Sequence, residues 1–351
     1  MVKRKQENAT NSPNVNNGQT NAAALSANNN YLGVTAAKGF LASGIKAGLK
    51  KSSNYDFGCV YSVKDAVAAG VFTSNKFAAA PVLISREQLA NSEIMRLIIV
   101  NSGSANACTG ETGMKLGRFV IEKSAKEFDV DERKILIAST GKIGVQLPIE
   151  QMLKNIKYLK ESLTNNSDNN FSRSIMTTDT VEKKFDVSFK IKNKTVVIGG
   201  CAKGAGMINP NMATMLCFIT TDAAITGAAL KTALNAAVGK SFNCITVDGD
   251  MSTNDTVFVL ANGMSDIDEI SDVESDEYKK FADKLAVVCV ELAKMIVRDG
   301  EGATKFLQIK VENAGSYERG KRIAELIANS SLVKTAFFGC DPNWGRIVSS
   351  I

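Results

Sequence analysis

The chain has 351 residues, of which 22% are charged and 44% are hydrophobic, and its formal net charge is +6. This length suits about two domains or one large body of two lobes, and the mild positive charge gives no sign of nucleic-acid binding. The chain contains no histidine, which excludes Ser-His-Asp and Cys-His catalytic groups, HExxH zinc sites and histidine-ligated haem. A catalytic base must therefore be a carboxylate, a lysine, a tyrosine, a thiolate or an α-amine.

The cysteines argue against a metal cluster, a redox motif or a disulfide framework. Their number is odd, seven, and no two of them form a CxxC pair. We expect free thiols that are buried as small hydrophobic side chains. They are Cys59, Cys108, Cys201, Cys217, Cys244, Cys289 and Cys340.

The N-terminal residues 1–30 are rich in Asn, Ser and Ala and poor in side chains that could be buried. They begin with basic residues but lack the apolar stretch of a secretory signal. No apolar run elsewhere approaches the roughly 20 residues that span a membrane. We therefore expect a disordered Asn-rich leader over residues 1–30 and a cytoplasmic protein without membrane contact.

From residue 31 onward, short apolar runs alternate with amphipathic stretches, as in a mixed α/β protein. Residues 97–100 predict a buried strand, which leads through a polar segment into a helix over residues 114–128. Residues 135–137 predict a second buried strand, and this strand ends in the small polar turn 139–141.

The second half of the chain continues this pattern. Strict alternation over residues 185–191, followed by a turn and the apolar residues 196–198, predicts an antiparallel hairpin. Residues 216–220 and 256–260 predict strands, and residues 276–297 predict a long amphipathic helix. The acidic run just before this helix is expected to be a solvated loop whose last carboxylates stabilise the helix N-terminus.

A glycine-rich segment, GGCAKGAG at residues 199–206, follows a predicted strand. Its spacing is not that of a GxGxxG turn that opens a helix, because Pro210 follows closely. The chain also has no GxxxxGK[ST] sequence. We therefore interpret the segment as a tight backbone bend and not as a nucleotide-binding loop.

Hydroxyl and small side chains gather at the ends of the apolar strands, as at Thr140 and Gly141. A backbone N–H beside a hydroxyl is a suitable donor pair for an oxyanion hole, and it requires no histidine. A threonine can act as a nucleophile without histidine when it is the first residue of a chain. Its own α-amine, with an unperturbed pKa of about 8, then serves as the base. An internal threonine reaches that state only after the preceding peptide bond is cut.

Residues 203–216, KGAGMINPNMATML, resemble the self-cleavage segment of the ornithine acetyltransferase family, the bifunctional glutamate N-acetyltransferases of the cyclic arginine pathway. The resemblance extends from about residue 33 to the end of the chain. Asn209 stands where the family often has a histidine, and the chain is shorter at its C-terminus than the family's members. Six further segments occur in the family's order, and they are residues 101–110, 139–148, 175–180, 247–255, 299–305 and 333–346.

The resemblance implies a layered α/β sandwich of the self-cleaving N-terminal-nucleophile ornithine acetyltransferase type, with two lobes. It implies autocleavage between Ala213 and Thr214. The α chain would then comprise residues 31–213, and the β chain residues 214–351 without the family's C-terminal tail.

The resemblance also implies the roles of individual residues. Thr214 would be the nucleophile that carries the acetyl group as an ester, with Thr140 and Gly141 as the oxyanion hole. Substrate would be bound by Thr177, Lys203, Thr214 and Glu301. The residue chemistry agrees, because Lys203 offers a positive charge to a substrate carboxylate and Glu301 offers a carboxylate to an ammonium group.

The aspartates of residues 247–255 are expected to be turn and capping residues, since the family needs no metal. They are Asp248, Asp250 and Asp255.

The implied reaction moves the acetyl group of N-acetylornithine to glutamate without a cofactor. The sequence leaves open whether acetyl-CoA is a further acetyl donor. The α and β chains would associate as a heterotetramer, and neither nucleic acid nor membrane would be a partner. Two alternatives remain open at this point. One is a related self-cleaving aminopeptidase or other hydrolase, and the other is an uncut, truncated protein without turnover.

Overall fold

The computed structural model describes residues 31–166, 169–209 and 215–351. The expected leader, residues 1–30, and the expected cleavage residues Ala213 and Thr214 therefore lie outside the described residues. Within the described part, one eight-stranded sheet has the strand order β4-β3-β2-β8-β7-β6-β5, and β1 also pairs with β2. The strands are β1 (Phe40–Ile45), β2 (Phe57–Phe72), β3 (Ile94–Ser104), β4 (Ile135–Lys142), β5 (Lys183–Ile191), β6 (Lys194–Lys203), β7 (Leu216–Thr221) and β8 (Thr256–Ala261).

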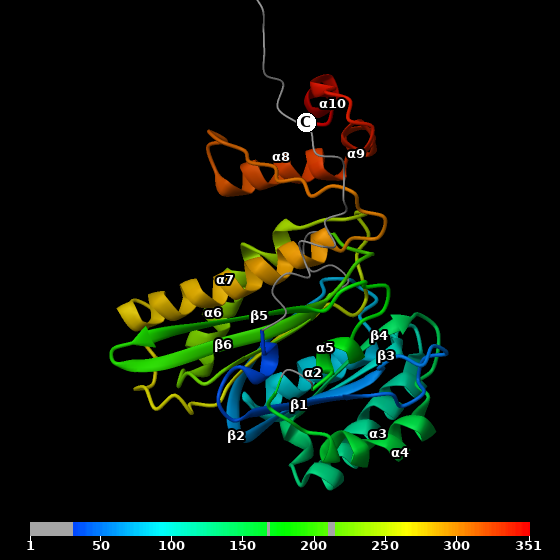
Figure 1. Ribbon diagram of the computed structural model, residues 1–351, viewed down its shortest axis with the longest axis vertical. Coiled ribbons are helices and arrows are strands. Elements are labelled where there is room, and N and C mark those ends of the chain that lie inside the picture. Colours follow the sequence, from blue (N-terminus) through cyan, green and yellow to red (C-terminus); the bar gives the residue numbers. More distant parts are fainter. Residues whose placement is uncertain (1–30, 167–168, 210–214) are drawn as a thin grey trace, which may run out of the picture.

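The helices form outer layers on the two halves of this sheet. Figure 1 shows α6 and α7 along the half that contains β5 and β6, and α3 and α4 along the half that contains β1 to β4. The helices are α2 (Ala80–Asn91), α3 (Gly110–Phe128), α4 (Ile149–Glu161), α5 (Phe171–Ser174), α6 (Gly227–Gly239), α7 (Asp276–Arg298), α8 (Tyr317–Asn329), α9 (Ser331–Phe338) and α10 (Trp344–Ser349).

The two halves of the sheet pack against each other through an inner core. On β3, Ile98 and Val100 lie in this inner core, whereas Leu97 and Ile99 pack with the residues of α3 and α4. On β7, Phe218 lies in the inner core and its neighbours pack against α6 and α7. Because side chains alternate between the faces of a strand, β3 and β7 are apolar on both faces. The predicted layered α/β fold is confirmed.

The long strand β2 links the two halves. Its first part pairs with β1 and β3, and its last part, from Val67 to Phe72, pairs with β8. The pairing with β3 shifts between Tyr61 and Ala66, as at a β-bulge, and such an irregularity bends a strand. One continuous strand can therefore serve both halves of the sandwich.

The predicted strands and the long helix are confirmed, with boundaries extended by one to several residues. The predicted turn at residues 139–141 is wrong, because β4 continues through them to Lys142. The predicted bend at residues 199–206 is wrong for residues 199–203, which belong to β6. The hairpin is β5 and β6, whose register runs from Ile191 opposite Lys194 to Lys183 opposite Ala202. The acidic run before α7 is a loop with exposed carboxylates, and the N-cap hydroxyl of Ser275 accepts a hydrogen bond from the Tyr278 N–H. This cap satisfies one of the free amides of the first turn.

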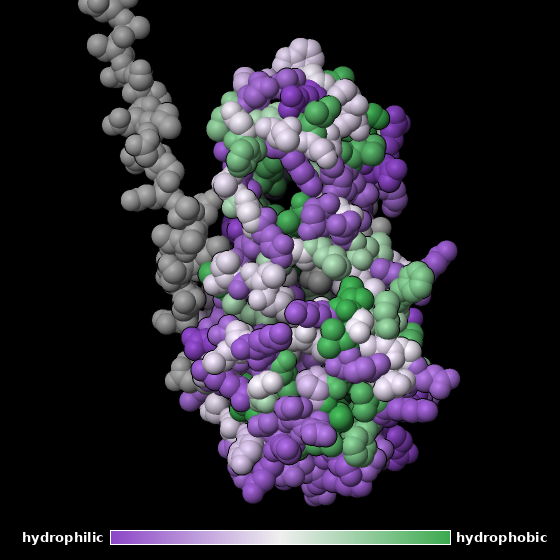
Figure 2. All heavy atoms as spheres, turned by 90° about the vertical axis from the view of Figure 1, so that its right-hand side faces the viewer, coloured by the Kyte–Doolittle hydropathy of each residue, from purple (hydrophilic) through white to green (hydrophobic). Residues whose placement is uncertain are grey.

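The C-terminal helices α8 to α10 stand apart from the sandwich (Figure 1). They expose several large apolar side chains, including Phe338, which is 70% exposed, and Trp344, which is 75% exposed. Figure 2 shows apolar side chains around a hollow between this part and the rest of the molecule. In the part of the chain that the structure describes, no helix has the length and apolar character needed to cross a membrane.

All seven cysteines are free, as predicted, but only four of them are buried. Cys108, Cys244 and Cys340 are exposed, so the prediction of buried thiols is wrong for these three. They lie in loops or at a helix end, where spacing in the sequence carries no information on burial. Among the buried thiols, desolvation raises the pKa of Cys289 to about 12, which keeps it a neutral hydrophobic group.

Candidate functional site

Lys203 lies at the centre of the candidate site, with only 2% of its surface exposed. It ends β6 on the same face as Cys201, which belongs to the inner core. Its Nζ donates hydrogen bonds to Thr177 Oγ1 at 2.7 Å and to Thr140 Oγ1 at 3.3 Å. Thr140 lies on β4 on the face of Ala138, which also packs in the inner core. Lys203 from one half of the sandwich and Thr140 from the other half thus meet at the candidate site.

The charge of Lys203 is balanced by Asp179, whose Oδ2 lies 3.9 Å from the Lys203 Nζ. Burial alone would raise the pKa of Asp179, but Lys203 and Lys183 outweigh it and hold that pKa well below its usual range. Burial likewise lowers the pKa of Lys203, and the charge of Asp179 opposes this effect. The site therefore holds a desolvated ammonium group, which attracts a substrate carboxylate more strongly than a solvated one would.

Gly141 follows Thr140 and has a backbone φ of 130°, a region that favours glycine. A Cβ atom placed on it would lie 2.4 Å from the carbonyl carbon of Gly103, its partner on β3. Only glycine fits this approach of two backbones. The residue type at position 141 is thus fixed by geometry.

Glu301 lies just beyond α7, with an exposed side chain. Its N–H donates to the carbonyl oxygen of Ala205 at 2.8 Å, and a Cβ on Gly206 would come within 2.6 Å of its carboxylate. Its negative charge is also close enough to raise the pKa of Lys203. The structure therefore brings Thr140, Thr177 and Lys203 into contact, and the backbone bond of Glu301 to Ala205 places Glu301 beside the segment that follows Lys203.

The proposed nucleophile, Thr214, lies outside the described residues, as does Ala213. The chain is described again from Met215, which is buried and whose N–H donates to Asp255 Oδ1 at 3.0 Å. The next residue, Leu216, is paired with Lys203 across β6 and β7. The residue after Thr214 is therefore held firmly, next to the strand that carries Lys203.

Asp255 differs from the other aspartates of its segment. Asp248 is a turn residue as predicted, since its carboxylate accepts the N–H groups of Ile208 and Asp250. Asp255 is buried at the start of β8, and its Oδ2 has no hydrogen-bond partner among the described residues. Burial raises the pKa of Asp255 to about 8, although Lys203 and nearby donors lower it. No group of three or more metal-ligating side chains occurs in the described ranges.

The buried acid predicts a pH-dependent stability. Between about pH 4 and pH 8 the folded chain keeps a proton on Asp255 that the unfolded chain has released, so the free energy of unfolding falls as pH rises. The limiting slope for one proton is about 1.4 kcal/mol per pH unit. We expect Asp255→Asn to remove much of this slope in urea unfolding followed by far-UV circular dichroism from pH 5 to 8. Asp250→Asn, at an exposed side chain, should leave the slope unchanged. Equal slopes in wild type and Asp255→Asn would contradict the assignment.

Three charged residues near the site were not predicted from sequence. They are Asp179, Lys183 and Asp299, which form a buried cluster behind Lys203. Asp179 and Asp299 lie inside segments that carry the family resemblance, and this position was the one sequence signal that could have identified them as site residues. Nothing in the sequence pattern around Lys183 indicates burial, because it lies in the polar run VEKK.

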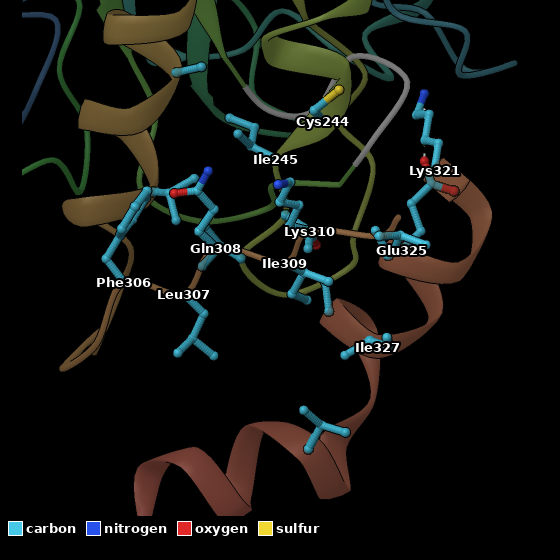
Figure 3. A pocket seen from close by; sticks show the side chains of 18 of the residues that line it. Cys244, Ile245, Phe306, Leu307, Gln308, Ile309, Lys310, Lys321, Glu325 and Ile327 are labelled. Atoms are coloured by element: carbon cyan, nitrogen blue, oxygen red, sulfur yellow. Dashed lines mark ion pairs between the residues drawn. The ribbon is translucent and has the colours of Figure 1, made fainter. Parts of the chain in front are cut away.

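A separate cavity of about 1080 Å³ lies between α7, α8 and the extended segment that connects them. Figure 3 shows Phe306, Leu307, Gln308 and Ile309 together on this segment. Glu301 lies on the cavity wall, whereas Thr140, Thr177 and Lys203 do not. The cavity therefore adjoins the candidate site at one residue and is otherwise distinct from it.

Comparisons with known proteins agree on one relationship. The ArgJ family model matches residues 41–351. The arginine biosynthesis bifunctional protein ArgJ of Dehalococcoides mccartyi is 47% identical over 320 residues, which are 90% of this chain and 78% of that protein. The glutamate N-acetyltransferase of Methanocaldococcus jannaschii is 48% identical over 325 residues, or 91% and 77% of the two chains.

A solved structure is similar as well. The crystal structure of the arginine biosynthesis bifunctional protein ArgJ from Bacillus halodurans matches with a TM-score of 0.50 and 40% sequence identity. The match covers 52% of this chain and 94% of that one.

Proposed function

Because the chain belongs to the ArgJ family, we propose that it is an acetyltransferase of arginine biosynthesis that moves the acetyl group of N-acetylornithine to glutamate. The observation that carries the proposal is the buried Lys203, bonded to Thr140 and Thr177 and paired with Leu216, two residues after Thr214. The name of the Methanocaldococcus jannaschii relative, a glutamate N-acetyltransferase, supports glutamate as the acetyl acceptor.

The chemistry divides into two acyl transfers. The Thr214 hydroxyl attacks the acetyl carbonyl of N-acetylornithine, its proton passes to the α-amine of Thr214, and ornithine leaves with that proton. The glutamate amine then attacks the acetyl ester, N-acetylglutamate leaves, and the hydroxyl regains its proton. An α-amine suits this role because its unperturbed pKa is near 8.

Substrate orientation follows from the charges at the site. Lys203 would hold the carboxylate that both amino-acid substrates carry, and Thr177, whose side chain is exposed, would bind beside it. Glu301 would hold an ammonium group of ornithine. The two ends of an amino acid would thus be held by opposite charges, which fixes its orientation.

The oxyanion would be stabilised by Thr140 and Gly141. The Thr140 hydroxyl accepts a hydrogen bond from the Lys203 ammonium, which leaves its own proton free to be donated. Donors that are fixed before the reaction stabilise the charge that develops on the carbonyl oxygen.

We further propose that the nucleophile is produced by autocleavage between Ala213 and Thr214. The Thr214 hydroxyl would attack the preceding carbonyl, and water would then hydrolyse the resulting ester. The two chains would stay associated as a heterotetramer, with acetyl-CoA as a further donor and no cofactor.

Product analysis tests the reaction class. Purified protein is incubated with N-acetylornithine, with and without glutamate, and the products are identified by mass spectrometry. A transferase gives N-acetylglutamate only when glutamate is present, whereas a hydrolase gives acetate and ornithine in both cases. A single 37.5 kDa band without either product would show an uncut, inactive protein. Acetate as the main product, or no turnover, would contradict the proposal.

A further inference from the structure

A buried ion-pair cluster lies behind the candidate site. Lys183 has a fully buried side chain, and its Nζ lies 2.7 Å from Asp179 Oδ1 and 2.6 Å from Asp299 Oδ2. A third bond, of 3.3 Å, goes to the carbonyl oxygen of Val181. All three protons of the ammonium group are thus used. A lysine held in this way serves as a fixed link between two carboxylates and not as a free charge.

Asp179 connects this cluster to the substrate-binding residues. Its Oδ2 accepts the N–H of Thr177 at 2.9 Å and faces Lys203, while its Oδ1 accepts the N–H of Gly204 at 2.6 Å. The backbone on each side of the site is therefore bonded to one carboxylate. A rotation of that carboxylate would displace both segments together.

Asp299 connects the cluster to the third segment of the site. Its carboxylate accepts hydrogen bonds from the hydroxyl and the N–H of Thr180, and it follows the last residue of α7. Two residues later, Glu301 bonds to Ala205. The cluster thus joins residues 177–180, the end of β6 and the loop of Glu301.

The charges of the cluster and of Lys203 cancel only when all four side chains are counted together. Lys183 and Lys203 carry two positive charges, and Asp179 and Asp299 carry two negative ones, all of them at most 9% exposed. A single buried charge without a partner is strongly destabilising. Removing one carboxylate should therefore disturb the positions of the others, because the remaining ammonium groups must find new partners.

We propose that the Asp179–Lys183–Asp299 cluster is a positioning device that sets the spacing of Thr177, Lys203 and Glu301 for a bound amino-acid substrate. The inference rests on the proposed function for the identity of that substrate. It assigns no direct contact with substrate to Lys183 or Asp299.

The test uses Asp299→Asn, which keeps the size of the side chain and removes its charge. We expect the KM values for N-acetylornithine and glutamate to rise about tenfold, since small misplacements of binding groups have large effects, while kcat changes less than about threefold. Hydrogen exchange at residues 177, 180, 181 and 204 should become faster, because the cluster carboxylates accept the N–H groups of these four residues. Thr180→Val, which removes one hydrogen bond and no charge, should shift KM in the same direction by less.

The control is Asp268→Asn, which breaks an exposed pair of the same kind, with Lys192 at 2.7 Å, and should change neither readout. A lower unfolding temperature for Asp299→Asn, with unchanged KM and unchanged exchange in the folded protein, would overturn the proposal. If Asp299→Asn does not fold, Thr180→Val becomes the test, and unchanged KM values and unchanged hydrogen exchange in that variant would contradict the proposal. The proposed function has its own readout in the wild-type assay. If the wild-type protein makes no N-acetylglutamate but Asp299→Asn still exchanges faster, the proposed reaction is refuted and the positioning role of the cluster is supported.

Discussion

Replacing Thr140 by alanine is expected to lower kcat for acetyl transfer by about 10²–10³, which corresponds to about 2.7–4 kcal/mol of transition-state stabilisation. The KM values should change little, because the developing negative charge exists only in the transition state. Thr140 is buried, and its hydroxyl is oriented by the Lys203 ammonium. Steady-state kinetics with N-acetylornithine and glutamate measure both values.

Ser139→Ala is the matched control for this prediction. Ser139 is also a buried hydroxyl residue on β4, but its Oγ donates to Asn101 Oδ1, away from Lys203. Its loss should cost stability and leave kcat within a few-fold of wild type. Thr140→Ser should retain most of the turnover. A Thr140→Ala enzyme with nearly full kcat would remove this hydroxyl from the oxyanion hole.

Much of the sheet could be predicted because its strands are short apolar runs. Residues 97–100 and 135–137 lie between two apolar layers, so both faces of β3 and β4 are hydrophobic and the runs are unbroken. The strand β2 was missed. Its middle contains Lys64 and Asp65 at the irregularity in its pairing, where the chain has no apolar alternation to recognise.

The candidate site could be predicted only in its residue types and order. The resemblance names Thr140, Thr177 and Lys203, and the structure brings these three side chains together. The burial of Lys203 depends on Asp179 and Lys183, which reach it only after β5 and β6 have paired. The raised pKa of Asp255 depends on packing around β8 in the same way. Such charge balances are properties of the folded chain, and no local pattern encodes them.

Replacing Thr214 by alanine is expected to abolish both self-cleavage and acetyl transfer. In the proposed mechanism, the hydroxyl is needed once to cut the chain and once to carry the acetyl group, and the α-amine that acts as base exists only after the cut. The variant should therefore give one band of 37.5 kDa on a denaturing gel, and mass spectrometry should detect no N-acetylglutamate. Wild type should give two chains, with N-terminal sequencing placing the start of the second at Thr214.

Thr214→Ser separates loss of chemistry from loss of structure. Serine keeps the hydroxyl, so the chain should still be cut, at a changed rate because the methyl group that restricts the side-chain rotamer is gone. Both variants should fold alike, since the next residue, Met215, is held by its N–H bond to Asp255 and by packing in the core. If Thr214 were only a β-branched residue before β7, alanine would cost a little stability and nothing else. A Thr214→Ala protein that still appears as two chains, or that transfers acetyl groups at the wild-type rate, would refute its role as nucleophile.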